Sequence, residues 1–313
     1  MRSRLQRVLL STAAALAGCG TTQAPQPGLW DAHTHVSWYG EEALTQLVAS
    51  GVVAVRDCGG DAEQLQQWRA EIEAGKRAGP RIYVSGPALD GPKDAPFRMT
   101  ITTPDEARRA VDELAAMKVD FIKTHNAIPR DAYFAALEQA RRRGLRVASH
   151  LPKGVPAWEA ADAGVGSIEH AAESLLASPI YAGHAADVDA AMAWWRSPAG
   201  DAALAHLAGT GVAITPTLVA YEVSTEMRRD TAMYAPRRRV LAFLIELTGR
   251  LHKAGIPLLA GSDFVSPEVA LVPGQSLLRE IELLRQAGLS QTEAFAAAGV
   301  NIERWFELSK YAQ

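Results

Sequence analysis

Short apolar segments alternate with helical patterns along most of this chain, and that alternation limits the folds open to it. Eight strand-like segments are found, at residues 29–33, 52–56, 81–85, 120–123, 145–150, 167–170, 212–215 and 257–261. Helix-start signals separate several of them, such as Pro104 before a helix expected at 107–117 and Pro129 before one expected at 132–143. Strand–helix alternation favours a parallel sheet, and eight such units predict one (β/α)8 barrel, the TIM barrel.

The first residues have the pattern of a bacterial export signal. Three arginines, Arg2, Arg4 and Arg7, precede an apolar stretch at 8–17 that is too short to cross a bilayer as a helix. The stretch ends in Leu16-Ala17-Gly18-Cys19, which resembles the lipobox, where the cysteine becomes the lipidated first residue. We expect a lipoprotein signal peptide at 1–19 with lipidated Cys19, and a location in the cell envelope, facing the periplasm or the cell surface. A plain cleaved signal with a chance cysteine is the alternative.

The remaining chain has the size of a single barrel domain, at 29–313, joined to Cys19 by a tether at 20–28. The formal net charge is −3 with no basic stripe, so we expect no nucleic-acid partner. Once Cys19 is lipidated only Cys58 is left, so no intrachain disulfide is expected. The stretch at 173–198 interrupts the alternation and is interpreted as an insertion over the barrel mouth, and 301–308 as a last helix.

Several strand-like segments end in side chains that bind metal ions. His33 and His35 are two residues apart on a strand, so their imidazoles point to the same face and could share one ion. Lys123 ends an apolar run, where an unpaired ammonium would be costly unless it is paired or modified, for example by carbamylation. Taken alone, the two histidines are also consistent with a polar strand end, and Lys123 with a surface lysine.

Three further candidates follow later segments. His150 and His170 lie on either side of one expected helix, which places them on adjacent strands. Asp263 follows the last segment, where an isolated aspartate more often caps a turn. The ordered set of four histidines, one lysine and one aspartate, all at strand ends, predicts a two-metal hydrolase centre.

The motifs that carry these residues resemble the amidohydrolase superfamily, nearest its imidazolonepropionase-like and prolidase-like branch. The matching stretches are 51–57, 79–81, 121–123, 167–170, 215–218, 260–263 and 273–277. The resemblance implies two divalent cations, most often zinc. It implies that one ion is held by His33, His35 and Asp263, that the other is held by His150 and His170, and that carbamylated Lys123 bridges them. Metal-bound hydroxide would then attack an amide carbonyl, with Asp263 carrying the proton.

The chain also departs from its relatives. Many of them carry a β-sandwich beside the barrel, but few residues separate Cys19 from the first strand, so we expect the barrel without one. Peptidase-like relatives often have a Gly-Gly-His loop after the third strand, whereas residues 86–93 contain no histidine. His125 is a candidate to replace it and Tyr221 a candidate to contact substrate. An ordinary loop histidine and a packing tyrosine are the alternatives.

The resemblance predicts an exported hydrolase that cleaves the amide bond of a peptide-like or N-acyl amino acid substrate. Opening of a small cyclic amide, such as an imidazolone or hydantoin, is the first alternative. A non-catalytic metal- or ligand-binding lipoprotein is the second. A deaminase is disfavoured, because residues 150–153 offer no acid beside His150. The expected partners are a small-molecule amide and, through the lipid anchor, a membrane.

Overall fold

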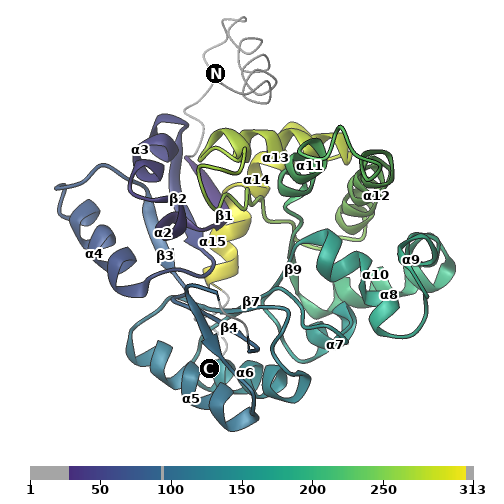
Figure 1. Ribbon diagram of the computed structural model, residues 1–313, viewed down its shortest axis with the longest axis horizontal. Helices are drawn as coiled ribbons and strands as arrows, with labels where there is room; N and C mark the ends of the chain where they lie inside the picture. The colour runs from purple at the N-terminus through teal and green to yellow at the C-terminus, as the bar shows by residue number, and fades with distance from the viewer. Residues whose placement is uncertain (1–27, 93–94, 308–313) are drawn as a thin grey trace, which may run out of the picture.

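The computed structural model describes residues 28–92 and 95–307, in which short strands alternate with helices (Figure 1). The predicted signal peptide, Cys19 and nearly all of the tether lie outside the described residues, so those assignments stay predictions. The strands are β1 Leu29–Thr34, β2 Val52–Asp57, β3 Arg81–Val84, β4 Ala88–Asp90, β5 Arg98–Thr100, β6 Ile122–Thr124, β7 Val147–Ser149, β8 Ser167–Glu169 and β9 Ala213–Thr215. Seven of the eight predicted segments are therefore strands, with ends shifted by up to two residues.

All strand pairs are parallel and fall into two sheets, ordered β1-β2-β3 and β5-β4-β6-β7-β8-β9. Within the described ranges no strand belongs to a β-sandwich. The eighth predicted strand, at 257–261, was wrong in detail, because this segment and the residues directly after it form only isolated bridges. The bridges are Ile214 to Leu258 and Thr34 to Phe264, so the segment lies between β9 and β1. Strands β4 and β5 were not predicted.

Backbone hydrogen bonds close the remaining gaps in the ring. The Ala32 amide donates to the Ala260 carbonyl at 2.8 Å, and the Asp120 amide donates to the Val84 carbonyl at 2.8 Å. The first bond joins β1 to the segment after β9, and the second joins β3 to the residues leading into β6. The strands thus form the α/β barrel that the alternation predicted, and the helices lie around it (Figure 1).

Helices follow the strands and cover the outer face of the barrel. The predicted helices at 107–117 and 132–143 appear as α5 and α6, and Thr103 forms a capping box with Glu106 at the start of α5. The predicted insertion at 173–198 begins within η2 and continues through α8 and α9. The helices are α2 Val36–Tyr39, α3 Glu42–Ala49, α4 Ala62–Glu73, α5 Pro104–Ala116, α6 Arg130–Arg142, α7 Ala157–Asp162, η2 Ala171–Leu176, α8 Ser178–Tyr181, α9 Val188–Trp195, α10 Pro198–Thr210, α11 Leu218–Glu226, α12 Tyr234–Lys253, α13 Gln275–Gln286, α14 Gln291–Ala297 and α15 Val300–Glu307.

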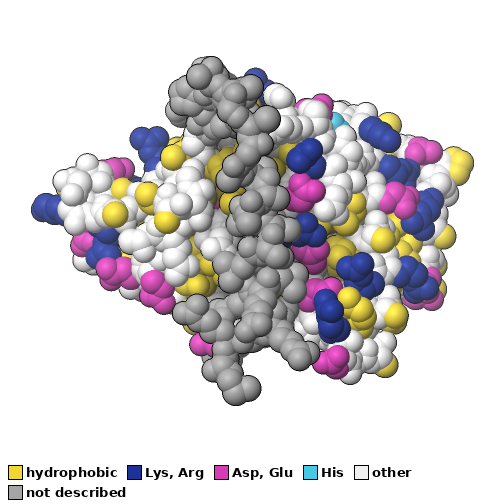
Figure 2. Space-filling view, turned by 90° about the horizontal axis from the view of Figure 1, so that it is seen from above, with side chains coloured by type: hydrophobic (Ala, Val, Ile, Leu, Met, Phe, Trp, Pro, Cys, Tyr) yellow, Lys and Arg dark blue, Asp and Glu magenta, His cyan; other side chains and the backbone are white. Residues whose placement is uncertain are grey.

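The outer surface is charged and mixed. Basic and acidic side chains are interspersed over the visible part of the face in Figure 2, so that part carries no patch of a single sign. In the described parts of the chain, no helix has the length and apolar character needed to cross a membrane.

The last helix, α15, packs against the inward-facing side chains of the barrel. Ile302 and Trp305 of α15 form one buried cluster with Ala32 of β1, with Cys58 directly after β2 and with Phe121 directly before β6. The cluster reaches the candidate ligands, because Cys58 Sγ lies within 4.8 Å of a ring nitrogen of His33.

Arg56 of β2 is buried and crosses the barrel interior. Its Nε donates to the Ala32 carbonyl at 2.5 Å, and its Nη2 donates to both oxygens of Glu169 at 2.8 and 2.9 Å. Its Nη1 donates to Ser167 Oγ at 3.0 Å, and its guanidinium lies 4.6 Å from the centre of the Trp305 ring. The ion pair is fully buried and fully hydrogen-bonded, so it couples β1, β2 and β8.

Removing this arginine should destabilise the fold strongly. In Arg56→Met, the Glu169 carboxylate would stay buried without its counter-ion, which costs about 3–5 kcal/mol of unfolding free energy. Arg108→Met, which removes an exposed pair with Asp105, is the matched control and should cost no more than about 1 kcal/mol. Urea denaturation of both variants measures the difference. Equal losses in the two variants would contradict the structural role given to Arg56.

Candidate functional site

A cavity of about 370 Å³ opens at the carboxyl ends of the strands, and it is large enough for a small molecule. All six predicted ligand residues line it, as do His125 and Tyr221, the two predicted substrate contacts. The predicted ligands are His33, His35, Lys123, His150, His170 and Asp263. Residues that are far apart in the sequence are brought together here because parallel strands end on the same rim of the barrel.

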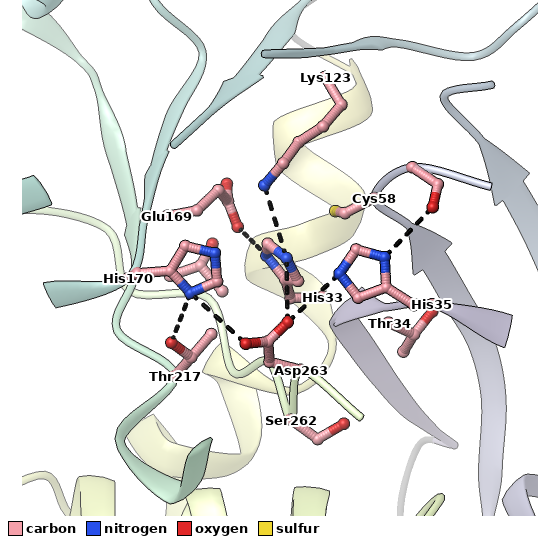
Figure 3. A network of polar contacts seen from close by, with 12 residues as sticks. His33, Thr34, His35, Cys58, Lys123, Glu169, His170, Thr217, Ser262 and Asp263 are labelled. Carbon is pink, nitrogen blue, oxygen red and sulfur yellow. Dashed lines mark hydrogen bonds and ion pairs between the residues drawn. The ribbon is translucent and has the colours of Figure 1, made fainter. Parts of the chain in front are cut away.

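Asp263 lies at the centre of the first group of side chains (Figure 3). Its Oδ1 is 3.5 Å from His33 Nε2 and 3.3 Å from His35 Nε2. The Asp263 amide donates to the His33 carbonyl at 2.8 Å, and its φ of 56° turns the backbone so that the side chain faces the two histidines. The three groups therefore present two nitrogens and one oxygen to a shared point.

The Nδ1 atoms of His33 and His35 face hydrogen-bond acceptors on the side away from the cavity. His33 Nδ1 lies 2.6 Å from Glu169 Oε2, and His35 Nδ1 lies 3.2 Å from the Gly59 carbonyl. Because both partners accept hydrogen bonds, each Nδ1 carries the proton and each Nε2 keeps its lone pair towards the cavity. This is the tautomer that a metal ligand needs.

The second group consists of His150, His170 and Lys123. His170 Nδ1 is 3.7 Å from Asp263 Oδ2 and 2.9 Å from Thr217 Oγ1 (Figure 3). The rings of His150 and His170 are 4.8 Å apart between centroids. His150 Nε2 is buried and has no hydrogen-bond partner among the described residues. Lys123 Nζ lies 3.5 Å from His33 Nε2, so this lysine also contacts the first group.

Burial sets the protonation of these side chains. It lowers the pKa of His33, His150 and His170 well below 6.5, and the positive charge of Lys123 adds to the effect in all three. Burial also lowers the pKa of Lys123 from its ordinary value of 10.5. These three imidazoles are therefore neutral at neutral pH and can donate a lone pair to a metal ion. The amine of Lys123 loses its proton more readily than an exposed lysine does.

These residues fit a metal centre with nitrogen and oxygen ligands. One atom each of His33, His170 and Asp263 lies within 4.8 Å of the others, which is close enough for them to converge on one ion. His33, Cys58 and Glu169 satisfy the same distance, but this second set suits an ion poorly. Glu169 is engaged by Arg56, and burial raises the pKa of Cys58 to about 12, so its thiol stays protonated.

Two buried acids that support the site received no role from the sequence. Glu169 orients His33, as described above. Asp31 accepts hydrogen bonds from Ser262 Oγ at 2.5 Å, from the Ser262 amide at 3.0 Å and from the His33 amide at 3.2 Å. It thereby fixes the segment before Asp263 against β1. Both acids lie inside apolar strand segments, where an acid needs partners, and that was the available signal.

The predicted substrate contacts also have specific neighbours. His125 Nδ1 lies 3.2 Å from Asp90 Oδ2, and its ring is 4.6 Å from that of His150. Tyr221 projects from α11, with the Arg237 guanidinium 4.3 Å from its ring centre. Among the other residues of the cavity wall, which the sequence did not single out as site residues, are Trp38, Arg98 and Glu173. Glu173 belongs to η2, so the predicted insertion contributes to this wall.

The pH dependence of stability should reveal the buried neutral histidines. In metal-free protein, His150 is protonated near pH 6.5 in the unfolded state but stays neutral in the folded state, where burial lowers its pKa. As the pH falls below 6.5, the unfolded state therefore binds more protons than the folded state. Below pH 6.5 the wild type should therefore lose stability relative to His150→Gln, by up to about 1.4 kcal/mol per pH unit. Titrating groups remote from His150 cancel in this difference.

Urea unfolding between pH 5 and 8, after metal removal, measures this effect. The control is His206→Gln, which alters a surface histidine with a side chain 49% exposed. A difference between wild type and His150→Gln that does not change with pH would show that folded His150 takes up protons freely.

Comparison with known proteins agrees with this site. The family model described as "Amidohydrolase family" matches residues 26–312. Bottromycin amidohydrolase is 26% identical with a TM-score of 0.71, and the alignment covers 90% of this chain and 67% of that one. A candidate prolidase from Bifidobacterium longum is also 26% identical, with a TM-score of 0.66 and coverage of 90% and 70%. Among curated proteins, no sequence matches this chain. The chain belongs to the amidohydrolase family and is a metal-dependent hydrolase of carbon–nitrogen bonds.

Proposed function

We propose that this protein is an exported, lipid-anchored hydrolase with two metal ions, which cleaves the amide bond of peptide-like or N-acyl amino acid substrates. The observation that carries the proposal is the convergence of six nitrogen- or oxygen-bearing side chains in one cavity. The unpartnered His150 Nε2 supports it further, because a buried acceptor without a partner is costly unless a ligand satisfies it. The lipobox-like sequence at Cys19 supports export and anchoring.

In this proposal the two groups of side chains hold one ion each. His33, His35 and Asp263 would hold the first, and His150 and His170 the second. Lys123 Nζ lies 3.5 Å from His33 Nε2, and reaction of its amine with carbon dioxide would give a carbamate anion that could serve as a ligand shared by both ions. The ions, with zinc the first candidate, would lower the pKa of bound water towards about 7 and polarise the substrate carbonyl.

The chain itself supplies the proton transfer. Asp263 keeps its side chain 20% exposed while the facing His33 ring is fully buried, so its carboxylate can reach both water and substrate. It would take the proton from the attacking water and deliver it to the leaving nitrogen, acting first as a base and then as an acid. Since that nitrogen leaves as an amine, an amide is the substrate class that uses this step.

A substrate panel tests the proposed activity. The zinc-loaded protein should hydrolyse at least one linear amide among dipeptides and N-acetyl amino acids, and activity should vanish on chelation and return with zinc. Turnover of hydantoin or an imidazolone alone would replace the proposal with opening of cyclic amides. Bound metal without turnover of any panel member would favour a binding protein.

Asp263→Asn should separate proton transfer from folding. The amide keeps the shape and hydrogen bonding of the side chain but cannot accept the proton, so kcat should fall by about 10²-fold or more. Glu222→Gln is the control, because it alters a carboxylate paired with Arg279 rather than a side chain lining the cavity. Thermal melting and metal analysis of both variants show whether fold and loading survive. If Asp263→Asn keeps near-normal kcat, the proton passes through another group, and His125 is the next to test.

A further inference from the structure

Arg98 lies on the wall of the candidate active site, where the proposed metal chemistry has no use for it. It is the first residue of β5, and its backbone pairs with Ala88 of β4. Its side chain is only 11% exposed and lines the cavity together with Trp38 and His125. A guanidinium stays charged at any physiological pH, so this cation needs an anionic partner.

The nearest carboxylate, Asp90, is already engaged. Its Oδ1 accepts hydrogen bonds from the Gly91 amide at 2.9 Å and from the Ala127 amide at 3.0 Å. Its Oδ2 lies 3.2 Å from His125 Nδ1 and 3.9 Å from Arg98 Nε, and neither contact is a hydrogen bond, because Oδ2 and His125 Nδ1 have no hydrogen-bond partner among the described residues. Asp90 therefore holds the following loop through Oδ1, and the guanidinium is left without a hydrogen-bonded counter-ion.

The guanidinium has unused donors. Nη1 of Arg98 is buried, and within the described parts of the chain it has no hydrogen-bond partner. Leaving a buried donor unpaired costs about 1–3 kcal/mol, and more for a charged group. A ligand anion in the cavity would remove that cost.

The position of Arg98 relative to the reaction centre fits such a ligand. Burial is the main cause of the lowered pKa values of His125 and His150, and the charge of Arg98 is a further cause in both. Arg98 is therefore within electrostatic reach of the candidate ligands. The cavity of about 370 Å³ includes both Arg98 and Asp263 in its lining, so one small molecule can contact both.

We propose that Arg98 binds a carboxylate of the substrate through charge-assisted hydrogen bonds. This rests on the proposed function and narrows it, because the substrates become amides whose amine product is an amino acid with a free carboxylate. The planar guanidinium matches a carboxylate with two parallel donors, which a lysine in the same position would not. Arg98 holds the carboxylate while the scissile amide faces Asp263.

A binding experiment tests Arg98 independently of turnover. Metal-depleted full-length protein is titrated calorimetrically with N-acetyl-L-leucine and with N-acetyl-L-leucine methylamide, which has a neutral group in place of the carboxylate. The wild type should bind the acid about 10- to 100-fold more tightly, as expected for a charged hydrogen bond. Arg98→Met should abolish that preference, and Arg98→Lys should keep part of it. Equal binding of both probes by the wild type would overturn the proposal, whether or not the variants fold.

Turnover gives the second readout. In zinc-loaded protein, acetate release from N-acetyl-L-leucine should show a KM raised about 10- to 100-fold by Arg98→Met, while release from the methylamide is unchanged. Arg108→Met, which alters an arginine on the outer helix α5, is the control and should behave as wild type. Equal impairment of both substrates by Arg98→Met would overturn the proposal by making Arg98 a structural residue. If the proposed function is wrong, zinc-loaded wild type will release no acetate from either probe. The calorimetric titration would still decide the role of Arg98 in that case.

Discussion

The buried carboxylate of Glu169 connects the interior of the barrel to the candidate metal centre. On one side it receives two hydrogen bonds from Arg56, and on the other it lies 2.6 Å from His33 Nδ1. The first contact helps to keep the carboxylate ionised: burial, the largest single influence, raises its pKa, but the charges of Arg56 and Lys123 and the hydrogen bond from Ser167 together lower the pKa of Glu169 below its ordinary value. The second fixes the ring orientation and tautomer of His33. Fold stability and ligand geometry therefore depend on the same side chain.

The chemistry of the cavity follows from how little water reaches its floor. Three imidazoles are kept neutral and one amine is biased towards its neutral form, so the strand ends offer lone pairs instead of positive charges. A centre of this kind binds cations, since divalent ions are held by neutral imidazoles and carboxylates. Arg98 on the wall has the opposite preference and is available for an anion. The two features together suit a substrate with a polarisable carbonyl at one end and a negative charge at the other.

The barrel and the converging residues could be predicted because short stretches of sequence indicate both. An apolar run ending in histidine, as at His150, combines a buried strand with an exposed strand end, and parallel strands bring such ends together. The segment around Leu258 was harder to predict in detail, since it joins the ring through only a few backbone bonds and not through a regular ladder.

The partners of the buried charges could not be predicted in the same way. Arg56 and Glu169 are 113 residues apart and meet only because β2 and β8 face each other across the barrel. Arg98 belongs to β5, a short strand that pairs with β4. No helical or alternating pattern in the sequence predicts this strand. Pairings of this kind are set by tertiary structure, so one sequence shows the need for a partner without showing which residue meets it.

Anomalous diffraction from crystals of the zinc-loaded protein tests the central claim most directly. The account predicts two zinc peaks in the cavity, about 3.5 to 4 Å apart, one beside His33, His35 and Asp263 and the other beside His150 and His170. Continuous density from Lys123 Nζ to both peaks would be the carbamate. A single peak, or zinc bound at Cys58 and Glu169 instead, would contradict the two-metal centre.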